Sequence, residues 1–220
     1  ANISMMKKEH DFMASPSRRK ELNFTLTASS PLDRHCIIVD GASLIEVSPR
    51  SVVSVSPFTG HEAEFNTAID NLFNVAYPST TKAFGLTGEN ACLLLPSSHN
   101  QWFLCFDDEV PDPVAAASDL FGQMTINQVA MTDQSDAWVT LALTGPLVYR
   151  TLERICPIDC SSTAMPIGTT ARTIIDHLGT IILRRPDDDN GNPCFWLMSA
   201  RSSAASFLHT INGSPPFNSQ

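Results

Sequence analysis

Apolar residues recur along the chain with two different spacings, one typical of strands and one typical of a helix. β-Branched, partly alternating residues fill 44–47 and 51–55, which predicts two strands. Over 61–73 the apolar positions follow the i, i+3, i+4, i+7, i+8 pattern of a helix with one buried face. Thr59-Gly60 before this segment and Pro78 after it are typical start and stop signals. The residues of the apolar face are Phe65, Ala68, Ile69, Leu72 and Phe73.

The same criteria predict the remaining elements. Pro113 opens a second helix through 121, where its missing N–H is tolerated in the first turn. A third helix is expected over 146–155 and a last one over 202–211, with Ser199 as its N-terminal cap. Asp, Asn, Gly and Pro over 186–193 predict an exposed turn. Further strands are predicted at 83–86, 91–95, 102–106, 137–145, 172–177, 180–184 and 195–198.

Both halves of the chain therefore run strand, Thr-Gly, helix, several strands, helix. Thr59-Gly60 and Thr144-Gly145 lie 85 positions apart in this plan. We predict an α+β fold of two pseudo-repeated units, each an antiparallel sheet with helices on one face. The expected units are 31–124 and 125–213, preceded by an extended or disordered arm over 1–30 and followed by a flexible tail over 214–220.

Composition narrows the class of protein. Residues are 43% hydrophobic and 17% charged, which excludes the disordered class and permits a sizeable core. The formal net charge of -9 would repel nucleic acid and anionic membranes, so neither is an expected partner. The stretch 83–149 contains no Lys or Arg. It is either a solubilising acidic face or a face that docks against a basic partner.

No apolar run approaches the ~20 residues needed to cross a bilayer. The first 21 residues contain basic side chains but no apolar core of a secretory signal, so we expect a cytoplasmic protein. Its six cysteines are then expected to be reduced and mostly buried. Cys156 and Cys160 are closely spaced, but one pair without a second pair or a nearby His is a weak zinc signal.

Sequence motifs for catalysis are missing. Neither Gly-rich phosphate loop occurs, the six His form no metal-binding pair, and no G-x-S-x-G turn is present. Arg172 and Arg201 could each bind a carboxylate or phosphate, or could tie loops together through carbonyl oxygens and acidic side chains. We therefore predict no catalytic, cofactor-binding or metal-binding residue in this chain.

Four blocks of the second half carry a resemblance to a known family. They are Leu143-Thr144-Gly145-Pro146, the segment 152–159, the segments 165–168 and 171–173, and Ser199-Ala200-Arg201-Ser202 leading into 205–207. In order and spacing these blocks resemble the gamma subunit family of heterotetrameric sarcosine oxidase. The first half matches more loosely, through 102–104 and the helix at 61–73, and the arm over 1–30 is not covered.

The resemblance implies a fold like the folate-binding domain of aminomethyltransferases and a non-catalytic role. It implies alpha, beta and delta subunits as partners, in a complex that oxidatively demethylates an N-methyl amino acid such as sarcosine. FAD, FMN, NAD and tetrahydrofolate would be bound by other subunits, as would zinc. The equivalent subunit of N-methylglutamate dehydrogenase or a related amine demethylase remains an alternative. So do a free-standing folate-dependent methyl or aminomethyl transferase and a regulatory or scaffold protein.

An obligate subunit needs apolar contacts at the centre of its interface, and aromatic residues are enriched there. Candidate contacts are Phe12, Phe24, Trp102, Phe121 and Trp138. The resemblance further marks a set of motif residues with an expected structural role: Gly145, Pro146, Asp159, Pro166, Gly168, Arg172, Arg201 and Ser202.

Overall fold

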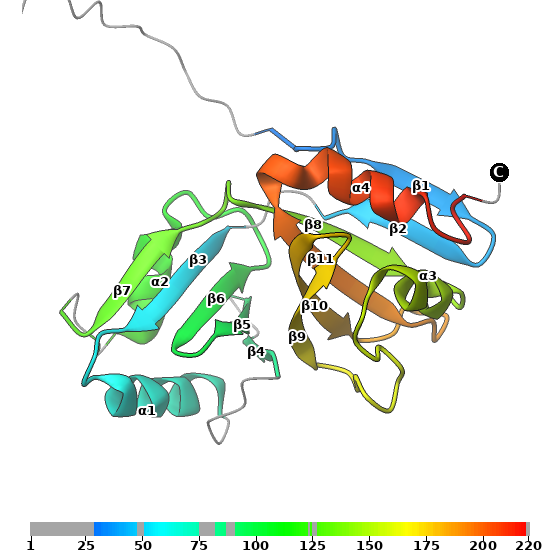
Figure 1. Cartoon of the computed structure of the whole chain (residues 1–220). Coiled ribbons are helices and arrows are strands. Elements are labelled where there is room, and N and C mark those ends of the chain that lie inside the picture. Colours follow the sequence, from blue (N-terminus) through cyan, green and yellow to red (C-terminus); the bar gives the residue numbers. More distant parts are fainter. Residues whose placement is uncertain are drawn as a thin grey trace, which may run out of the picture.

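The computed structural model describes residues 29–47, 51–74, 82–86, 91–122, 124 and 127–218. Within these ranges the strands form a five-stranded and a six-stranded sheet, and every neighbouring pair is antiparallel (Figure 1). The five-stranded sheet has the order β4 (Phe84–Leu86), β5 (Cys92–Ser98), β6 (Gln101–Phe106), β3 (Val52–Pro57), β7 (Val129–Asp133). The six-stranded sheet has the order β1 (Cys36–Val39), β2 (Ala42–Glu46), β8 (Trp138–Thr144), β11 (Cys194–Ala200), β10 (Leu178–Arg185), β9 (Thr170–Ile175).

Each sheet is covered on one face by two helices. α1 (Glu62–Phe73) and α2 (Pro113–Phe121) pack on the five-stranded sheet, around Phe65, Trp102 and Phe121. α3 (Val148–Ile155) and α4 (Ala204–Asn212) pack on the six-stranded sheet, around Phe195 and Phe207. We call these two assemblies the five-stranded half and the six-stranded half. The predicted α+β class, with helices on one face of antiparallel sheets, is confirmed.

The other faces of the two sheets share a third core. Leu93, Leu95 and Phe103 from the five-stranded sheet cluster with Ile181 and Trp196 from the six-stranded sheet. Strands β5, β6, β10 and β11 therefore bury both of their faces, which explains why their sequences are continuously apolar rather than alternating. The layers run helices, sheet, sheet, helices.

The sheets also meet at their edges. Lys82, just before β4, forms an isolated antiparallel bridge with Thr169, just before β9. The Ala83 N–H donates to the Gly168 carbonyl at 2.8 Å. Arg172 of β9 donates from Nη1 to the Ser97 carbonyl of β5 at 3.3 Å. The two halves are thus joined by hydrogen bonds as well as by the shared core.

Two strands lie in the sheet of the opposite half. β2 precedes β3 in the chain but pairs with β8, and β7 precedes β8 but pairs with β3. Strand pairing therefore does not follow the predicted division into 31–124 and 125–213: β1 and β2 belong to the six-stranded sheet and β7 to the five-stranded one. Strand partners are set by contacts distant in sequence, which a local pattern does not reveal.

Most predicted helices are confirmed, with small shifts at their ends. The helices expected over 61–73 and 113–121 are α1 and α2, and Asp112 Oδ1 caps α2 by accepting from the Ala115 N–H at 2.9 Å. The last helix is preceded by a 3-10 turn over Arg201–Ser203, so Ser199 does not cap it. Instead, Ser199 lies in β11 and its hydroxyl donates to the Gly179 carbonyl at 3.1 Å.

The predicted flexible tail is wrong over its first residues. Phe217 is 4% exposed and packs in the core of the six-stranded half. The Thr151 hydroxyl donates to the Pro215 carbonyl at 2.8 Å. Burial of the Phe217 side chain therefore attaches this largely polar segment to the core.

Candidate functional site

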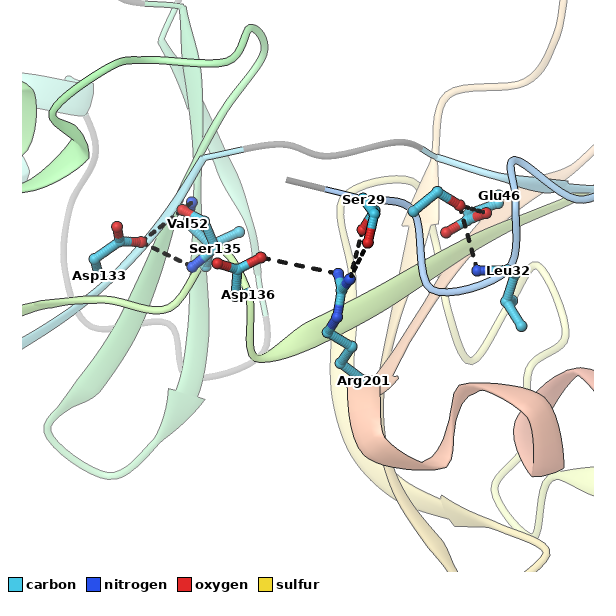
Figure 2. A network of polar contacts seen from close by, with 9 residues as sticks. Ser29, Leu32, Glu46, Val52, Asp133, Ser135, Asp136 and Arg201 are labelled. Carbon is cyan, nitrogen blue, oxygen red and sulfur yellow. Dashed lines mark hydrogen bonds and ion pairs between the residues drawn. The ribbon is translucent and has the colours of Figure 1, made fainter. Parts of the chain in front are cut away.

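Arg201 lies where the start of the described chain meets both halves (Figure 2). Its Nη2 donates to the carbonyl of Ser29, and Nη1 lies 3.9 Å from the Asp136 carboxylate. Its backbone N–H donates to the Ala137 carbonyl at 2.9 Å. Arg201 therefore joins the segment at 29, the turn between β7 and β8, and the end of β11. A hollow of about 580 Å³ lies beside it, lined by Pro31, Asp136, Ala137, Arg201 and Ser202.

A buried carboxylate holds the same segment from the other side. Glu46 of β2 is 6% exposed and accepts hydrogen bonds from the Ser30 hydroxyl and from the His35 N–H. Ser30 Oγ in turn accepts from the Arg34 N–H at 2.7 Å. A buried carboxylate is stable only when hydrogen-bonded, so Glu46 fixes the turn over 30–35 against β2.

The turn between β7 and β8 is fastened to the five-stranded sheet. Asp133 Oδ1 accepts from both the N–H and the hydroxyl of Ser135, at 2.9 and 2.6 Å. Ser135 Oγ accepts from the Val52 N–H of β3 at 3.0 Å (Figure 2). Through the neighbouring Asp136, this turn reaches Arg201. These contacts connect the two halves. The guanidinium of Arg201 already contacts oxygen acceptors in this arrangement.

A second surface feature is an apolar groove between α1 and α2. It has a volume of about 260 Å³ and is lined by Ala68, Asn71, Leu72, Leu120, Phe121 and Gly122. Both helices carry acidic residues, including Glu64 and Asp119. We call this feature the α1–α2 groove. An apolar floor with acidic surroundings is suited to a basic amphipathic segment.

Two of the predicted interface aromatics are buried inside the chain and a third is half-buried. Trp102 and Phe121 are 1% and 3% exposed and pack against Phe65, so both are core residues of the isolated chain and their assignment as exposed interface aromatics is corrected; Phe121 contributes only to the floor of the α1–α2 groove. Trp138 is half-buried and makes an edge contact with Phe103 at 5.1 Å between centroids. Phe12 and Phe24 lie outside the described residues.

Gly145 and Pro146 form the turn from β8 into α3. Gly145 has φ +132°, and a Cβ there would lie 2.5 Å from the Gly41 carbonyl oxygen. Only glycine fits this conformation and this contact. The β1–β2 hairpin consequently packs directly on the turn, and Leu147 N–H donates to the Gly41 carbonyl at 3.0 Å.

The other motif residues are spread over both ends of the six-stranded half, with Gly168 beside Arg184 at one end and Arg201 beside Ala137 at the other. Asp159 Oδ1 accepts from the Ser161 N–H at 2.8 Å, and hydrogen bonds from Ser161 hold the pKa of this carboxyl below its usual range. The Pro166 carbonyl accepts a hydrogen bond from the Thr169 N–H at 2.9 Å. Gly168 adopts φ +85° at the point where the two halves meet. Ser202 lies beside Arg201 at the hollow. The motif residues therefore do not converge on a single cavity.

Ser29, Glu46 and Asp136 help to connect the segment around 29–35, β2 and the β7–β8 turn near Arg201. These three residues were not singled out in the sequence. Glu46 had a usable signal, because it is the last residue of an apolar strand and falls at a core-facing position, two residues after Leu44. Ser29 and Asp136 had none, since their partner is more than 60 residues away in the chain.

The described residues contain no group of three or more His, Cys, Asp or Glu side chains placed to hold a metal ion. Among the helices in the part of the chain that the structure describes, none is long and apolar enough to cross a membrane.

Comparisons with known proteins identify the fold. No protein-family model matches the chain, and no curated protein matches it in sequence. A chain of the heterotetrameric sarcosine oxidase from Corynebacterium sp. U-96, solved with pyrrole 2-carboxylate, is similar with a TM-score of 0.61 and 16% identity. The match covers 84% of this chain and 92% of that one.

The glycine cleavage system aminomethyltransferase T from Bartonella henselae is similar with a TM-score of 0.56 and 14% identity. The match covers 79% of this chain but 46% of that one, so this chain spans less than half of the transferase. At such identities the likeness establishes the fold alone, which is of the aminomethyltransferase type.

Proposed function

We propose that this chain is a non-catalytic accessory subunit, equivalent to the gamma subunit, of a flavin-dependent complex of the sarcosine oxidase type. The complex would oxidise the N-methyl group of sarcosine or a related N-methyl amino acid and release it as formaldehyde or methylene-tetrahydrofolate. The main support for this proposal is the match in length. The structural match covers 92% of one chain of a heterotetrameric sarcosine oxidase. The order and spacing of the second-half sequence blocks add to it.

Folate binding by this chain itself has little support in its residues. The aminopyrimidinone edge of a pteridine pairs well with a buried carboxylate. Glu46 is buried, but its oxygens accept from Ser30 and His35, and it lines neither the hollow at Arg201 nor the α1–α2 groove. Tetrahydrofolate, FAD, FMN, NAD and zinc are accordingly proposed for other subunits, in a cytoplasmic complex.

We place the partner contact at the α1–α2 groove. Residues 51–136 contain eleven Asp and Glu but a single basic residue, Lys82, so a basic segment of the partner subunit is favoured electrostatically. Leu72 and Leu120 line the groove and are only half-buried in the isolated chain, which leaves apolar area for the partner to cover. The arm with Phe12 and Phe24 is a second proposed contact.

The test is native purification of the affinity-tagged chain from its source cells. We expect it to bring along much larger flavoprotein chains whose flavin absorption is bleached anaerobically by sarcosine or N-methylglutamate. Bleaching by one and not the other identifies the substrate. Purification of a colourless chain without partners would contradict the proposal. Deleting 1–22 should weaken recovery of the complex while leaving the circular dichroism of the isolated chain nearly unchanged.

Two substitutions test whether the partner subunit binds at the α1–α2 groove or at another surface. Leu72→Arg should abolish recovery of the complex, because it places a cation where the proposed partner segment is basic. Ile174→Arg, on the exposed edge strand β9 of the other half, is the matched control. If both variants assemble with undiminished yield and salt resistance, the groove is not the interface.

The alternative of a free-standing folate-dependent transferase draws on the similarity to the aminomethyltransferase. It is distinguished by calorimetry of the purified chain with tetrahydrofolate. The accessory-subunit proposal predicts no tight binding, and micromolar or tighter binding would favour the transferase.

We also propose that the two halves are pseudo-repeats with exchanged first strands. The order β4-β5-β6-β3-β7 corresponds step by step to β9-β10-β11-β8-β2. In both halves the strand before the first helix ends near a glycine with positive φ, Gly60 or Gly145. Such an exchange would make each half dependent on the other for a complete sheet.

A further inference from the structure

Two cysteines meet just beyond α3 in the six-stranded half. Cys156 follows the last helical residue, and Cys160 lies four positions later in the loop toward β9. Their Sγ atoms are 3.8 Å apart, with the Cys160 thiol donating toward Cys156. Both residues are buried, at 7% and 6% exposure. The zinc interpretation gains no third ligand from the described residues.

A surface hollow of about 350 Å³ reaches this pair. It is lined by Tyr149 and Glu153 from α3 and by a continuous loop segment that includes Asp159 and Cys160. The second sulfur, that of Cys156, lies behind Cys160 and is also 3.9 Å from the Thr173 hydroxyl of β9. A small solute in the hollow therefore meets Cys160 first, and the Cys156 sulfur lies 3.8 Å beyond the Cys160 sulfur.

We propose that Cys156 and Cys160 form a redox-active dithiol site that hydrogen peroxide, entering through this hollow, oxidises to an intramolecular disulfide. A disulfide has an S–S length of about 2.05 Å, so the sulfurs must approach by less than about 2 Å. Cys160 sits in a loop, where rotation of its side chain can supply this approach. Bulky disulfides such as oxidised glutathione fit a buried pair less well than peroxide does.

The protonation of the pair favours this chemistry. The hydrogen bond from Cys160 lowers the pKa of the Cys156 thiol to about 6, more than offsetting its burial. The pKa of Cys160 is raised, first by that same hydrogen bond and then by burial and the negative charges of Cys156 and Asp159. Glu153 and Asp159, both acidic, are the charged groups at the hollow. The pair therefore holds one thiolate and one thiol at neutral pH, as a nucleophile and a resolving group require.

The reaction proceeds in two balanced steps. The Cys156 thiolate attacks one oxygen of hydrogen peroxide, the O–O bond breaks, and hydroxide leaves with formation of a sulfenic acid. Cys160 then displaces the hydroxyl group from the Cys156 sulfur, forming the S–S bond, and its proton leaves with the second oxygen as water. Two thiols and one peroxide give one disulfide and two waters, with two electrons passing from sulfur to oxygen.

The other cysteines provide internal controls. All six are free thiols in the structure. Cys92 of β5 is 2% exposed, and burial together with the nearby Asp107 raises its pKa to about 12. It should react with peroxide far more slowly than the pair, since the thiolate is the reactive form.

The experiment treats the full-length chain with graded hydrogen peroxide at pH 6.5, followed by denaturation, alkylation without reductant and peptide mass spectrometry. Before peroxide, six alkylated thiols are expected. After it, two should be lost, both in the peptide containing 156 and 160, at least about tenfold faster than Cys92 is lost. Dithiothreitol should restore them. Loss of Cys92 at a similar rate, or a disulfide between other cysteines, would overturn the proposal.

Two variants assign the roles. Cys160→Ser should leave Cys156 as a sulfenic acid that reacts with dimedone, while Cys156→Ser should slow oxidation of Cys160 at least about tenfold. Equal oxidation of Cys160 with and without Cys156 contradicts the proposal. The peptide mapping on the unsubstituted chain gives the answer even if one variant does not fold.

Discussion

The five-stranded and six-stranded halves are both antiparallel sheets with two helices on one face, but they differ in charge and in how closely the backbone packs at the turn before the first helix. Residues 51–136, which form the five-stranded half, contain eleven Asp and Glu and one Lys or Arg, whereas 29–47 and 137–220, which form the six-stranded half, contain nine Asp and Glu and seven Lys or Arg. A Cβ added at Gly60 would have no neighbour within 4 Å, but one at Gly145 would collide with the backbone at 41 and 42. The five-stranded half is thus strongly acidic and open at this glycine, and the six-stranded half is less acidic and closely packed there.

This difference has a structural cause in the β1–β2 hairpin. The hairpin adds the outermost strand to the six-stranded sheet and packs its turn against the start of α3. The five-stranded sheet ends at β7 instead. Surface available for a partner is therefore expected on the five-stranded half, and internal rigidity on the six-stranded half.

Substitutions of Gly145 and Gly60 should show the largest difference in stability between the two halves. Gly145→Ala should destabilise the chain by about 3–5 kcal/mol or prevent folding, because it adds a collision with the Gly41 carbonyl to an unfavourable φ. Gly60→Ala, with φ +93° and open space, should lose about 1–2 kcal/mol from the backbone alone. Urea denaturation of both variants measures the difference. Equal losses would show that the hairpin does not close on the turn.

A somewhat smaller effect tests the exchanged strands. Leu44 of β2 is fully buried in the core of the six-stranded half, and Leu44→Ala should cost about 2–4 kcal/mol. Ile45→Ala, on the same strand but 40% exposed, is the control and should cost less than about 1 kcal/mol.

Hydrogen exchange of the Leu44→Ala chain shows whether the halves unfold together. If they share strands and a core as described, amides of β6 and β11 should lose protection to the same extent. Loss confined to β11 would mean that the five-stranded half is stable on its own.

The sequence predicted helices better than it predicted strand partners. The 3.6-residue period at 65–73 and Pro113 were sufficient for α1 and α2, because each presents one apolar face to one sheet. Strand β1 has a short alternating sequence at a sheet edge and was missed, as was β7. β1 pairs with its chain neighbour β2, but β2 pairs with β8 almost 100 residues away and β7 pairs with β3 more than 70 residues away. These two distant pairings follow from tertiary packing that no local window contains.

The assignment of Trp102 to an interface failed for a related reason. Trp102 stands in the run Gln-Trp-Phe-Leu-Cys-Phe, which has no polar alternation because helices cover one face of β6 and the second sheet covers the other. An aromatic residue in such a run is core. Tying loops together was one of the two roles considered for Arg201, and its contacts with Ser29 and Asp136 are of that kind, but these partners come from segments distant in sequence.

The smallest predicted effect concerns two thiols with opposite pKa shifts. Cys92 in the five-stranded half has its pKa raised to about 12 by burial and by Asp107, whereas Cys156 in the six-stranded half has its pKa lowered to about 6 by the hydrogen bond from Cys160. An unfolded cysteine titrates near pH ~8.5. Cys92 therefore contributes stability that is fully present below that pH and is lost as the pH rises toward 12. Cys156 contributes stability that is present above that pH and is lost as the pH falls through 6.

Matched substitutions separate these two contributions under reducing conditions. Between pH 8 and pH 10 the unsubstituted chain should lose up to about 1 kcal/mol more stability than Cys92→Ala, which has no thiol to titrate. Between pH 8 and pH 5.5 it should lose more than Cys156→Ala, for which the acid-sensitive contribution is absent. Each variant serves as the control for the other, because other titrating groups are common to both. Urea denaturation at the three pH values gives the result, and parallel pH profiles for all three chains would mean that neither thiol is perturbed by its half of the fold.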